Sequence, residues 1–184
     1  LGILSSPGAT HLHAQDTDYP DREVGIRAAG LNNFGIIYKK KNADNNFRRY
    51  RLGVASLAFT SSPNSQAGNL RASIAAGHEK RKMINNKFHF IHGLELLGDL
   101  NFTASRTTNA NQGAVTLSPG VGFVLGFQYA IAPSFYISLE TVPSVNVAFG
   151  IDGSGFREEV AVSAGFNSQS AALNLVYRFN KRAS

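Results

Sequence analysis

Hydrophobic and polar residues alternate along most of the chain after residue 21. In residues 115–129 the odd positions are apolar, aromatic or proline, while the even positions are mostly Thr, Ser, Gly and Gln; residues 135–149 show a similar alternation. Successive side chains of a β-strand point to opposite faces, so each run predicts a strand with one apolar and one polar face. No segment shows convincing helical periodicity, and we expect an all-β fold.

Segments rich in Asn, Gly, Pro and Ser separate these runs, and such residues favour turns. They divide the chain into eight strands, an even number that suits an antiparallel up-and-down β-barrel. The strands expected are residues 22–30, 34–41, 47–60, 69–81, 87–104, 114–130, 134–149 and 170–179. A change of the apolar face near Ala55 and Ser56 predicts a β-bulge. Short breaks alternate with longer outer loops at residues 61–68, 105–113 and 150–169, and residues 156–169 either extend the last hairpin or form an extra strand.

The composition distinguishes between membrane and soluble sheets. Of the 184 residues, 43% are hydrophobic and 16% are charged, whereas a soluble domain has roughly 25% charged residues. No apolar run approaches the roughly 18 residues of a membrane-spanning helix, but a tilted membrane strand needs only about 9–11 residues. Alternating strands keep the average hydropathy modest, so the composition favours a transmembrane β-barrel.

The polar face indicates which side of the sheet is inside. A membrane barrel points its apolar face towards lipid and has a polar interior. Here the polar positions combine many glycines with charges of both signs, which suits a narrow interior where buried ions are paired. We therefore expect a closed lumen with a structural ion-pair network formed by Arg71, Glu79, Arg81, Glu95, Asp99, Glu140 and Arg178.

The last strand carries the clearest two-faced pattern. Leu173, Leu175, Tyr177 and Phe179 share one face, and the other face carries Asn174, Val176 and Arg178. We expect the first set to face lipid. The strand should close the barrel against residues 22–30, with Arg178 paired to a lumen carboxylate, first of all Glu140.

Two segments resemble the OmpA-like and OmpX-like families of small bacterial outer-membrane barrels. The turn from Tyr129 to Phe135, followed by Ser138-Leu139-Glu140, is similar to their short periplasmic turn, and residues 173–179 are similar to their final strand. The resemblance implies a location in the bacterial outer membrane, short periplasmic turns and longer outer loops. These families usually end at the terminal aromatic residue, whereas residues 180–184 follow it here and are expected to form a short C-terminal tail.

The N-terminal region is expected to lie outside the barrel domain, which we assign to residues 22–179. Leu12 and Ala14 precede Gln15 with the spacing of a signal-peptidase site. Residues 1–21 are therefore interpreted as the remnant of a signal peptide or as a disordered tail.

No motif predicts catalysis, a metal or a cofactor. The chain has no Cys, and His89 and His92 point to opposite faces of one strand. Two pairs could act as catalytic or conducting groups, Glu95 with Asp99 and Glu140 with Arg178, and both are interpreted as parts of a structural salt-bridge network. The net charge of +6 fits solvated turns, or attraction to anionic lipid and lipopolysaccharide. The basic residues lack the interleaved aromatic platforms of single-strand nucleic-acid binders.

Three functions remain open on the sequence. The first is a structural or interaction barrel of the outer membrane, acting through its outer loops, either as a monomer or with other envelope proteins. The second is a narrow channel or porin for small solutes. The third is a secreted soluble barrel that binds an apolar ligand. A lipid A-modifying barrel enzyme is a further alternative, although no compact Ser and His arrangement supports it.

Overall fold

Ten antiparallel strand segments make up the part of the chain that the structure describes. The computed structural model describes residues 21–29, 33–62, 65–107, 110–152, 155–165 and 171–180. The segments are β1 (Arg22–Ala28), β2 (Phe34–Ala43), β3 (Asn46–Ser62), β4 (Ser65–Met83), β5 (Phe88–Thr107), β6 (Ala110–Ala132), β7 (Phe135–Thr141), β8 (Ser144–Asp152), β9 (Gly155–Gly165) and β10 (Ala171–Phe179). Within these residues, no helix is long and apolar enough to cross a membrane.

The ten segments make eight barrel strands. Strand β6 pairs first with β7 and then with β8, so β7 and β8 are two parts of one barrel strand, separated at Val142-Pro143. Likewise β10 pairs with β7 and β9 pairs with β8, which places β9 and β10 on the same side of that strand. Pairing of β1 with both β2 and β10, and of β5 with β6, closes the ring. The predicted eight-stranded antiparallel barrel is confirmed.

Two of the features that interrupt regular pairing lie at Pro143 and near Ser56. Pro143 has no N–H to donate to a neighbouring strand, and the barrel strand is broken there, although its carbonyl still accepts a hydrogen bond from Phe123 N at 2.9 Å. The β3–β4 register shifts between Val54 and Ser56, which confirms the predicted bulge.

The three predicted outer loops are largely strand instead. Strands β3 and β4 continue to Ser62 and from Ser65, and β5 and β6 pair as far as Thr107 and Ala110. Once two antiparallel strands are paired in register, their backbone hydrogen bonds can continue without an apolar face. The Asn-, Ser- and Gly-rich segments at residues 61–68 and 105–113 therefore did not end the strands. Residues 155–165 form β9, which extends the last hairpin and leaves the count of barrel strands even. Residues 1–20 and 181–184, and with them most of both predicted tails, lie outside the described residues.

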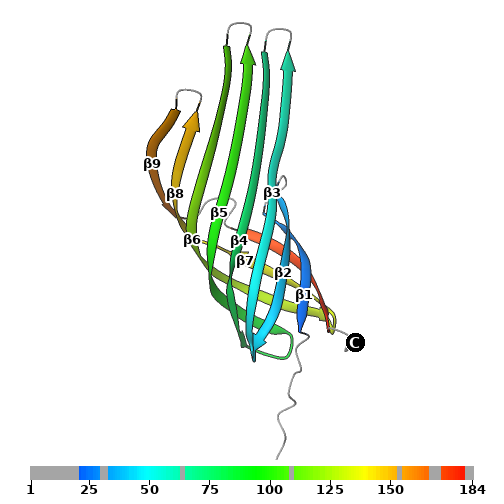
Figure 1. The fold of residues 1–184 in the computed structure, drawn as a ribbon. Coiled ribbons are helices and arrows are strands. Elements are labelled where there is room, and N and C mark those ends of the chain that lie inside the picture. The colour runs from blue at the N-terminus through cyan, green and yellow to red at the C-terminus, as the bar shows by residue number, and fades with distance from the viewer. Residues whose placement is uncertain are drawn as a thin grey trace, which may run out of the picture.

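The hairpins at one end are much longer than a membrane requires. Strands β5 and β6 have 20 and 23 residues, about twice the 9–11 residues of a typical membrane strand. Figure 1 shows the β3–β4 and β5–β6 hairpins rising well beyond the short strands β1 and β2. The opposite end carries the short turns, including the β2–β3 turn, where Asn45 adopts a positive φ of 56°. The barrel therefore has one compact end and one projecting end.

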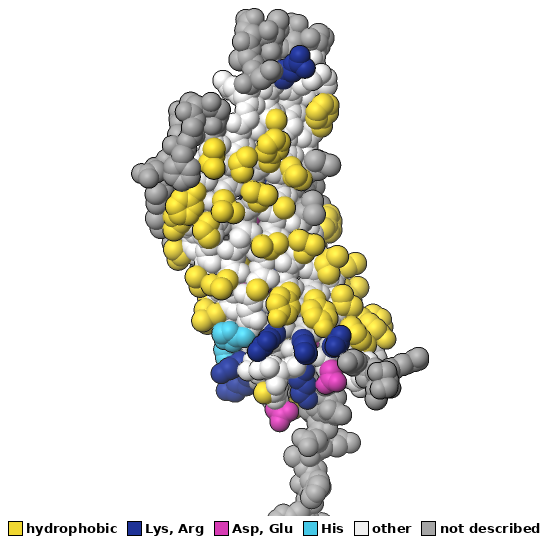
Figure 2. Space-filling model, viewed as in Figure 1, with side chains coloured by type: hydrophobic (Ala, Val, Ile, Leu, Met, Phe, Trp, Pro, Cys, Tyr) yellow, Lys and Arg dark blue, Asp and Glu magenta, His cyan; other side chains and the backbone are white. Residues whose placement is uncertain are grey.

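The distribution of side chains is the inverse of that in a soluble barrel. The largest fully buried side chains include Arg49, Lys39, Glu23, Glu79 and Glu95, each at most 1% exposed. A small apolar group of Ile37, Tyr136 and Val176 is buried among them. Large aliphatic side chains instead cover the outside, as the yellow band in Figure 2 shows. Exposed apolar surface this extensive is typical of contact with lipid or with another protein.

The cross-strand register arranges the outer apolar side chains in a continuous belt. Ile26 lies opposite Ile36, Ile36 opposite Leu52, and Leu52 opposite Ile74, and all four are 53–63% exposed. On the other side Ile26 lies opposite Leu175 of the closing strand, which is itself 51% exposed. We call this row the apolar belt.

The apolar belt predicts a position-dependent cost of charge on the outer wall. We expect Ile36→Arg to lower the free energy of unfolding in phospholipid vesicles by about 2–4 kcal/mol, because a buried guanidinium would face hydrocarbon. Ser61→Arg, at an exposed position on the same face as Phe59 in the projecting part of β3, should change it by less than about 1 kcal/mol. Equilibrium denaturation in urea measures both values, and equal costs at the two positions would contradict a lipid-facing belt.

Candidate functional site

The lumen holds a cluster of buried ion pairs centred on Arg49 of β3. Its Nη1 lies 2.9 Å from Glu79 Oε2 and its Nη2 lies 2.7 Å from Glu140 Oε2, while its Nε pairs with Glu95. Lys39 Nζ reinforces the group, at 2.7 Å from Glu79 Oε2 and 3.5 Å from Glu140 Oε1. One guanidinium therefore ties together carboxylates from β4, β5 and β7, across the width of the barrel.

A second layer lies towards the compact end. Arg81 donates to both oxygens of Glu23, at 2.8 and 2.6 Å, and its Nε donates to Glu79 Oε1 at 2.8 Å. The Tyr136 hydroxyl donates to Glu23 Oε2 at 2.6 Å. The Arg81 guanidinium also lies 3.7 Å from the centre of the Phe47 ring, a cation–π contact. This layer links β1, β4 and β7.

The cluster continues towards the projecting end. Arg51 binds both carboxylate oxygens of Glu95, and Arg27 Nη1 lies 3.3 Å from Glu140 Oε2. Ser138 donates to Glu140 Oε1 at 3.1 Å and in turn accepts from Asn174 of β10 at 2.9 Å. Together the three layers draw side chains from every barrel strand except β6.

Glycines make room for the carboxylates. Across the β4–β5 pair, Glu79 lies opposite Gly93 and Glu95 lies opposite Gly77, and across the β6–β7 pair Glu140 lies opposite Gly126. A Cβ added at Gly126 would meet Glu140 Cγ at 3.1 Å and at Gly77 would meet Glu95 Cγ at 2.9 Å, both closer than ordinary contacts. The nearest atoms to such a Cβ are backbone oxygens of the adjacent strand, Leu94 O for Gly77 and Leu139 O for Gly126. These glycines therefore allow close approach of the strands and also leave room for the carboxylates.

The structure places the predicted network residues in two groups. Glu79, Arg81, Glu95, Glu140 and Arg178 belong to the cluster. Arg71 and Asp99 lie outside it, and neither is joined by an ion pair to another described residue. Arg71 is eight residues from Glu79 along β4, about 26 Å of extended chain, so sharing a face did not bring it to the cluster.

The predicted partnership of Arg178 with Glu140 is wrong. Arg178 lies directly opposite Glu23 in the β1–β10 register, and its Nε is 3.4 Å from Glu23 Oε1. Glu140 lies opposite Ala172, six residues further along β10, which corresponds to about 20 Å. Alternation predicts the face of each residue but does not determine this register.

The cluster also contains residues that were not assigned to the network from the sequence. They are Glu23, Arg27, Lys39, Arg49 and Arg51. All five occupy the polar face of their strands, so the alternation that identified the other members was the signal for them as well.

The closing strand alternates as expected. Leu173, Leu175 and Tyr177 are 53%, 51% and 42% exposed, and Phe179 is partly exposed. The residues of the other face, Ala172, Asn174, Val176 and Arg178, are buried. The structure thus places this row on the outer wall, next to the apolar belt.

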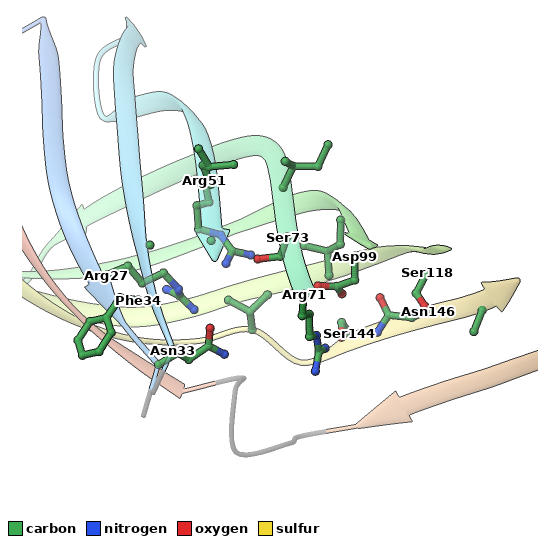
Figure 3. A pocket seen from close by; sticks show the side chains of 18 residues that line it. Arg27, Asn33, Phe34, Arg51, Arg71, Ser73, Asp99, Ser118, Ser144 and Asn146 are labelled. Atoms are coloured by element: carbon green, nitrogen blue, oxygen red, sulfur yellow. Dashed lines mark hydrogen bonds between the residues drawn. The ribbon is translucent and has the colours of Figure 1, made fainter. Parts of the chain in front are cut away.

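A cavity of about 260 Å³ lies beyond the cluster towards the projecting end. Figure 3 shows Arg27, Arg51, Arg71 and Asp99 around it, together with Ser73, Ser118, Ser144 and Asn146. The cavity is polar and ends at the ion pairs of Arg27 and Arg51. It can hold water or a small polar solute, and the cluster below it is buried, with Arg49, Glu79 and Glu140 each at most 1% exposed.

The charged groups of the cluster are paired with one another, and we call the cluster the plug. Each of its carboxylates is held by at least two cations, and charged groups out of water are stable only when they are paired and hydrogen-bonded in this way. Among the described residues, no three His, Asp or Glu side chains are grouped so that they could hold a metal ion.

Comparison with solved structures identifies the fold. The chain is similar to the attachment invasion locus protein Ail of Yersinia pestis, with 15% sequence identity, a TM-score of 0.50, and coverage of 86% of this chain and 96% of that one. It is also similar to a major outer membrane protein from Thermus thermophilus, with 10% identity, a TM-score of 0.52, and coverage of 86% and 99%. No protein-family model and no curated protein sequence matches the chain. The shared property is the fold of small outer-membrane barrels.

The geometry of Arg49 predicts a large effect of its removal. Arg49→Met should lower the free energy of unfolding by about 3–5 kcal/mol, because three buried carboxylates lose a shared partner. Adding Glu140→Gln to this variant should increase the loss, because five cations already face four carboxylates without Arg49, and Arg27 and Lys39 would then lose their shared carboxylate. Urea unfolding in vesicles tests this, with the exposed Arg106→Gln as a control that should stay within about 0.5 kcal/mol of the wild type. An Arg49→Met variant with the same free energy of unfolding as the wild type would show that the cluster does not stabilise the barrel.

Proposed function

We propose that the protein is a bacterial outer-membrane β-barrel with a structural or interaction role, and that it has no catalytic activity. The observation that carries this proposal is the inverted polarity of the barrel: its centre is ion-paired, while its wall is apolar around the belt. Only an apolar environment outside the wall makes that arrangement favourable. The likeness in fold to outer-membrane proteins agrees with it.

The orientation follows from the two unlike ends. Outer-membrane barrels have short periplasmic turns and longer extracellular loops. The compact end of this barrel would then face the periplasm, and the β3–β4, β5–β6 and β8–β9 hairpins would project from the cell. Exposed polar hairpins on a rigid barrel are well suited to recognition, and lipopolysaccharide or another envelope component is the partner within their reach.

The plug weighs against the channel alternative. A porin needs a continuous aqueous path, whereas the cluster fills the lumen with side chains that bind one another from opposite walls. The wall weighs against the soluble alternative, because a barrel in water would not expose a belt of Ile and Leu at 53–63%.

Folding and conductance measurements test the barrel assignment together. The purified chain should fold only with detergent micelles or phospholipid vesicles, and should give a heat-sensitive mobility shift in gel electrophoresis. In planar bilayers it should produce no steady ion current. A stable monomer in plain buffer would support the soluble barrel, and a steady current would support the channel.

Shortening one hairpin tests the interaction role. Replacing residues 104–113 with an Asn-Gly turn should leave folding and the heat-sensitive shift intact, because the deletion removes only the projecting parts of β5 and β6. Binding of the folded barrel to lipopolysaccharide micelles or to whole cells should fall at least about tenfold. Undiminished binding to both would argue against recognition by this hairpin.

A further inference from the structure

A group of outward-facing basic residues lies at the compact end of the barrel, on strands β1 to β4. We call Arg22, Lys40, Arg48, Lys80 and Lys82 the basic rim. They have the same strand parity as the apolar belt: Arg22, Lys40 and Arg48 are each four residues from Ile26, Ile36 and Leu52 on the same strand. Figure 2 shows dark blue side chains gathered directly below the yellow band at this end.

The register brings like charges face to face. Arg22 lies directly opposite Lys40, and Lys40 lies directly opposite Arg48. Like charges in such pairs destabilise a sheet unless a counter-charge is nearby. Within the described part of the chain no ion pair joins any rim residue to a carboxylate, whereas neighbouring Lys41 lies 3.7 Å from Asp44. The rim is thus a row of positive charge without a counter-ion among the described residues.

The depth of the rim is set by the aromatic pair next to it. Tyr38 and Tyr50 stack with ring centroids 6.3 Å apart, immediately between the apolar belt and Lys40 and Arg48. Tyrosines favour the boundary between hydrocarbon and headgroups. Lys40 and Arg48 are two residues further out, about 7 Å along the strand, which is the level of lipid phosphates.

The rest of the circumference at this end is different in character. On β5, β6, β7 and β10 the outer wall carries stacked or tilted aromatic pairs: Phe88 with Phe127, Phe90 with Phe127, Phe135 with Tyr177, and Tyr177 with Phe179. Among the described residues of the outer wall at this end, the basic ones therefore occupy one sector and are not spread evenly.

We propose that the basic rim binds the phosphate headgroups of anionic phospholipids in the periplasmic leaflet. The inference rests on the membrane insertion and orientation proposed above. Several phosphates, or one lipid with two phosphates, would neutralise the Arg22–Lys40–Arg48 row while their acyl chains lie along the apolar belt. Because the rim is at the compact end, its ligand is a phospholipid and not lipopolysaccharide, which occupies the opposite leaflet.

Native mass spectrometry of the folded barrel in a neutral detergent tests this proposal. Phosphatidylglycerol or phosphatidylcholine is added, and the lipid that the barrel retains is counted. The wild type should retain phosphatidylglycerol at least about tenfold better than phosphatidylcholine, with a preference that falls as salt rises. The triple variant Lys40→Gln/Arg48→Gln/Lys80→Gln should lose the preference, since each charge near an anionic surface contributes about fivefold and three contribute on the order of a hundredfold.

Two controls keep the outcomes separate. Arg106→Gln removes one charge at the projecting end and should keep the preference, and Lys40→Arg/Arg48→Lys conserves the rim charge and should keep it too. The gel mobility shift checks that every variant is folded. Equal retention of phosphatidylglycerol by the wild type and the triple variant would overturn the proposal. Failure of the wild type to fold in any lipid would instead overturn the proposed function.

Discussion

The structure depends on the pairing of opposite charges inside a space too narrow for bulk water. Within the described lumen, six cations share four carboxylates in one connected cluster, with Arg49 at its centre. Isolated, any of these groups would be costly to bury, and together they hold one another in place. Because members come from nearly every barrel strand, the cluster acts as an internal cross-link. The glycines opposite Glu79, Glu95 and Glu140 leave space for it. Because strand side chains alternate between two faces, the apolar residues lie on the opposite face and form the outer wall.

This arrangement links stability to function. Under the proposed function the ion pairs close the lumen, and what the barrel presents to its surroundings is its outer wall and its two ends. The projecting hairpins offer polar surface far from the belt. The compact end offers aromatic side chains over one sector and the basic rim over the other. The barrel is thus a rigid support whose two ends have different chemistry.

Alternation in the sequence was sufficient for the strand count, the bulge at Val54–Ser56 and the inner and outer faces, because the side-chain period of two is a local property. It was not sufficient for partners within the lumen. Arg178 meets Glu23 and not Glu140 because the register of β10 is set separately against β1 and β7. The lengths of the projecting hairpins were missed for a related reason: strands already in register continue through polar sequence that is typical of loops.

Contact between the wall and lipid is the central claim, and nuclear Overhauser measurements on methyl-labelled protein in lipid nanodiscs test it most directly. Ile36 and Leu175 lie on the belt, while their neighbours Ile37 and Val176 are fully buried in the lumen. We predict transfer from lipid acyl protons to the methyl groups of Ile36 and Leu175, with none to Ile37 or Val176. Transfer to Ile37 and Val176 instead, or equally to both faces, would contradict a lipid-facing wall.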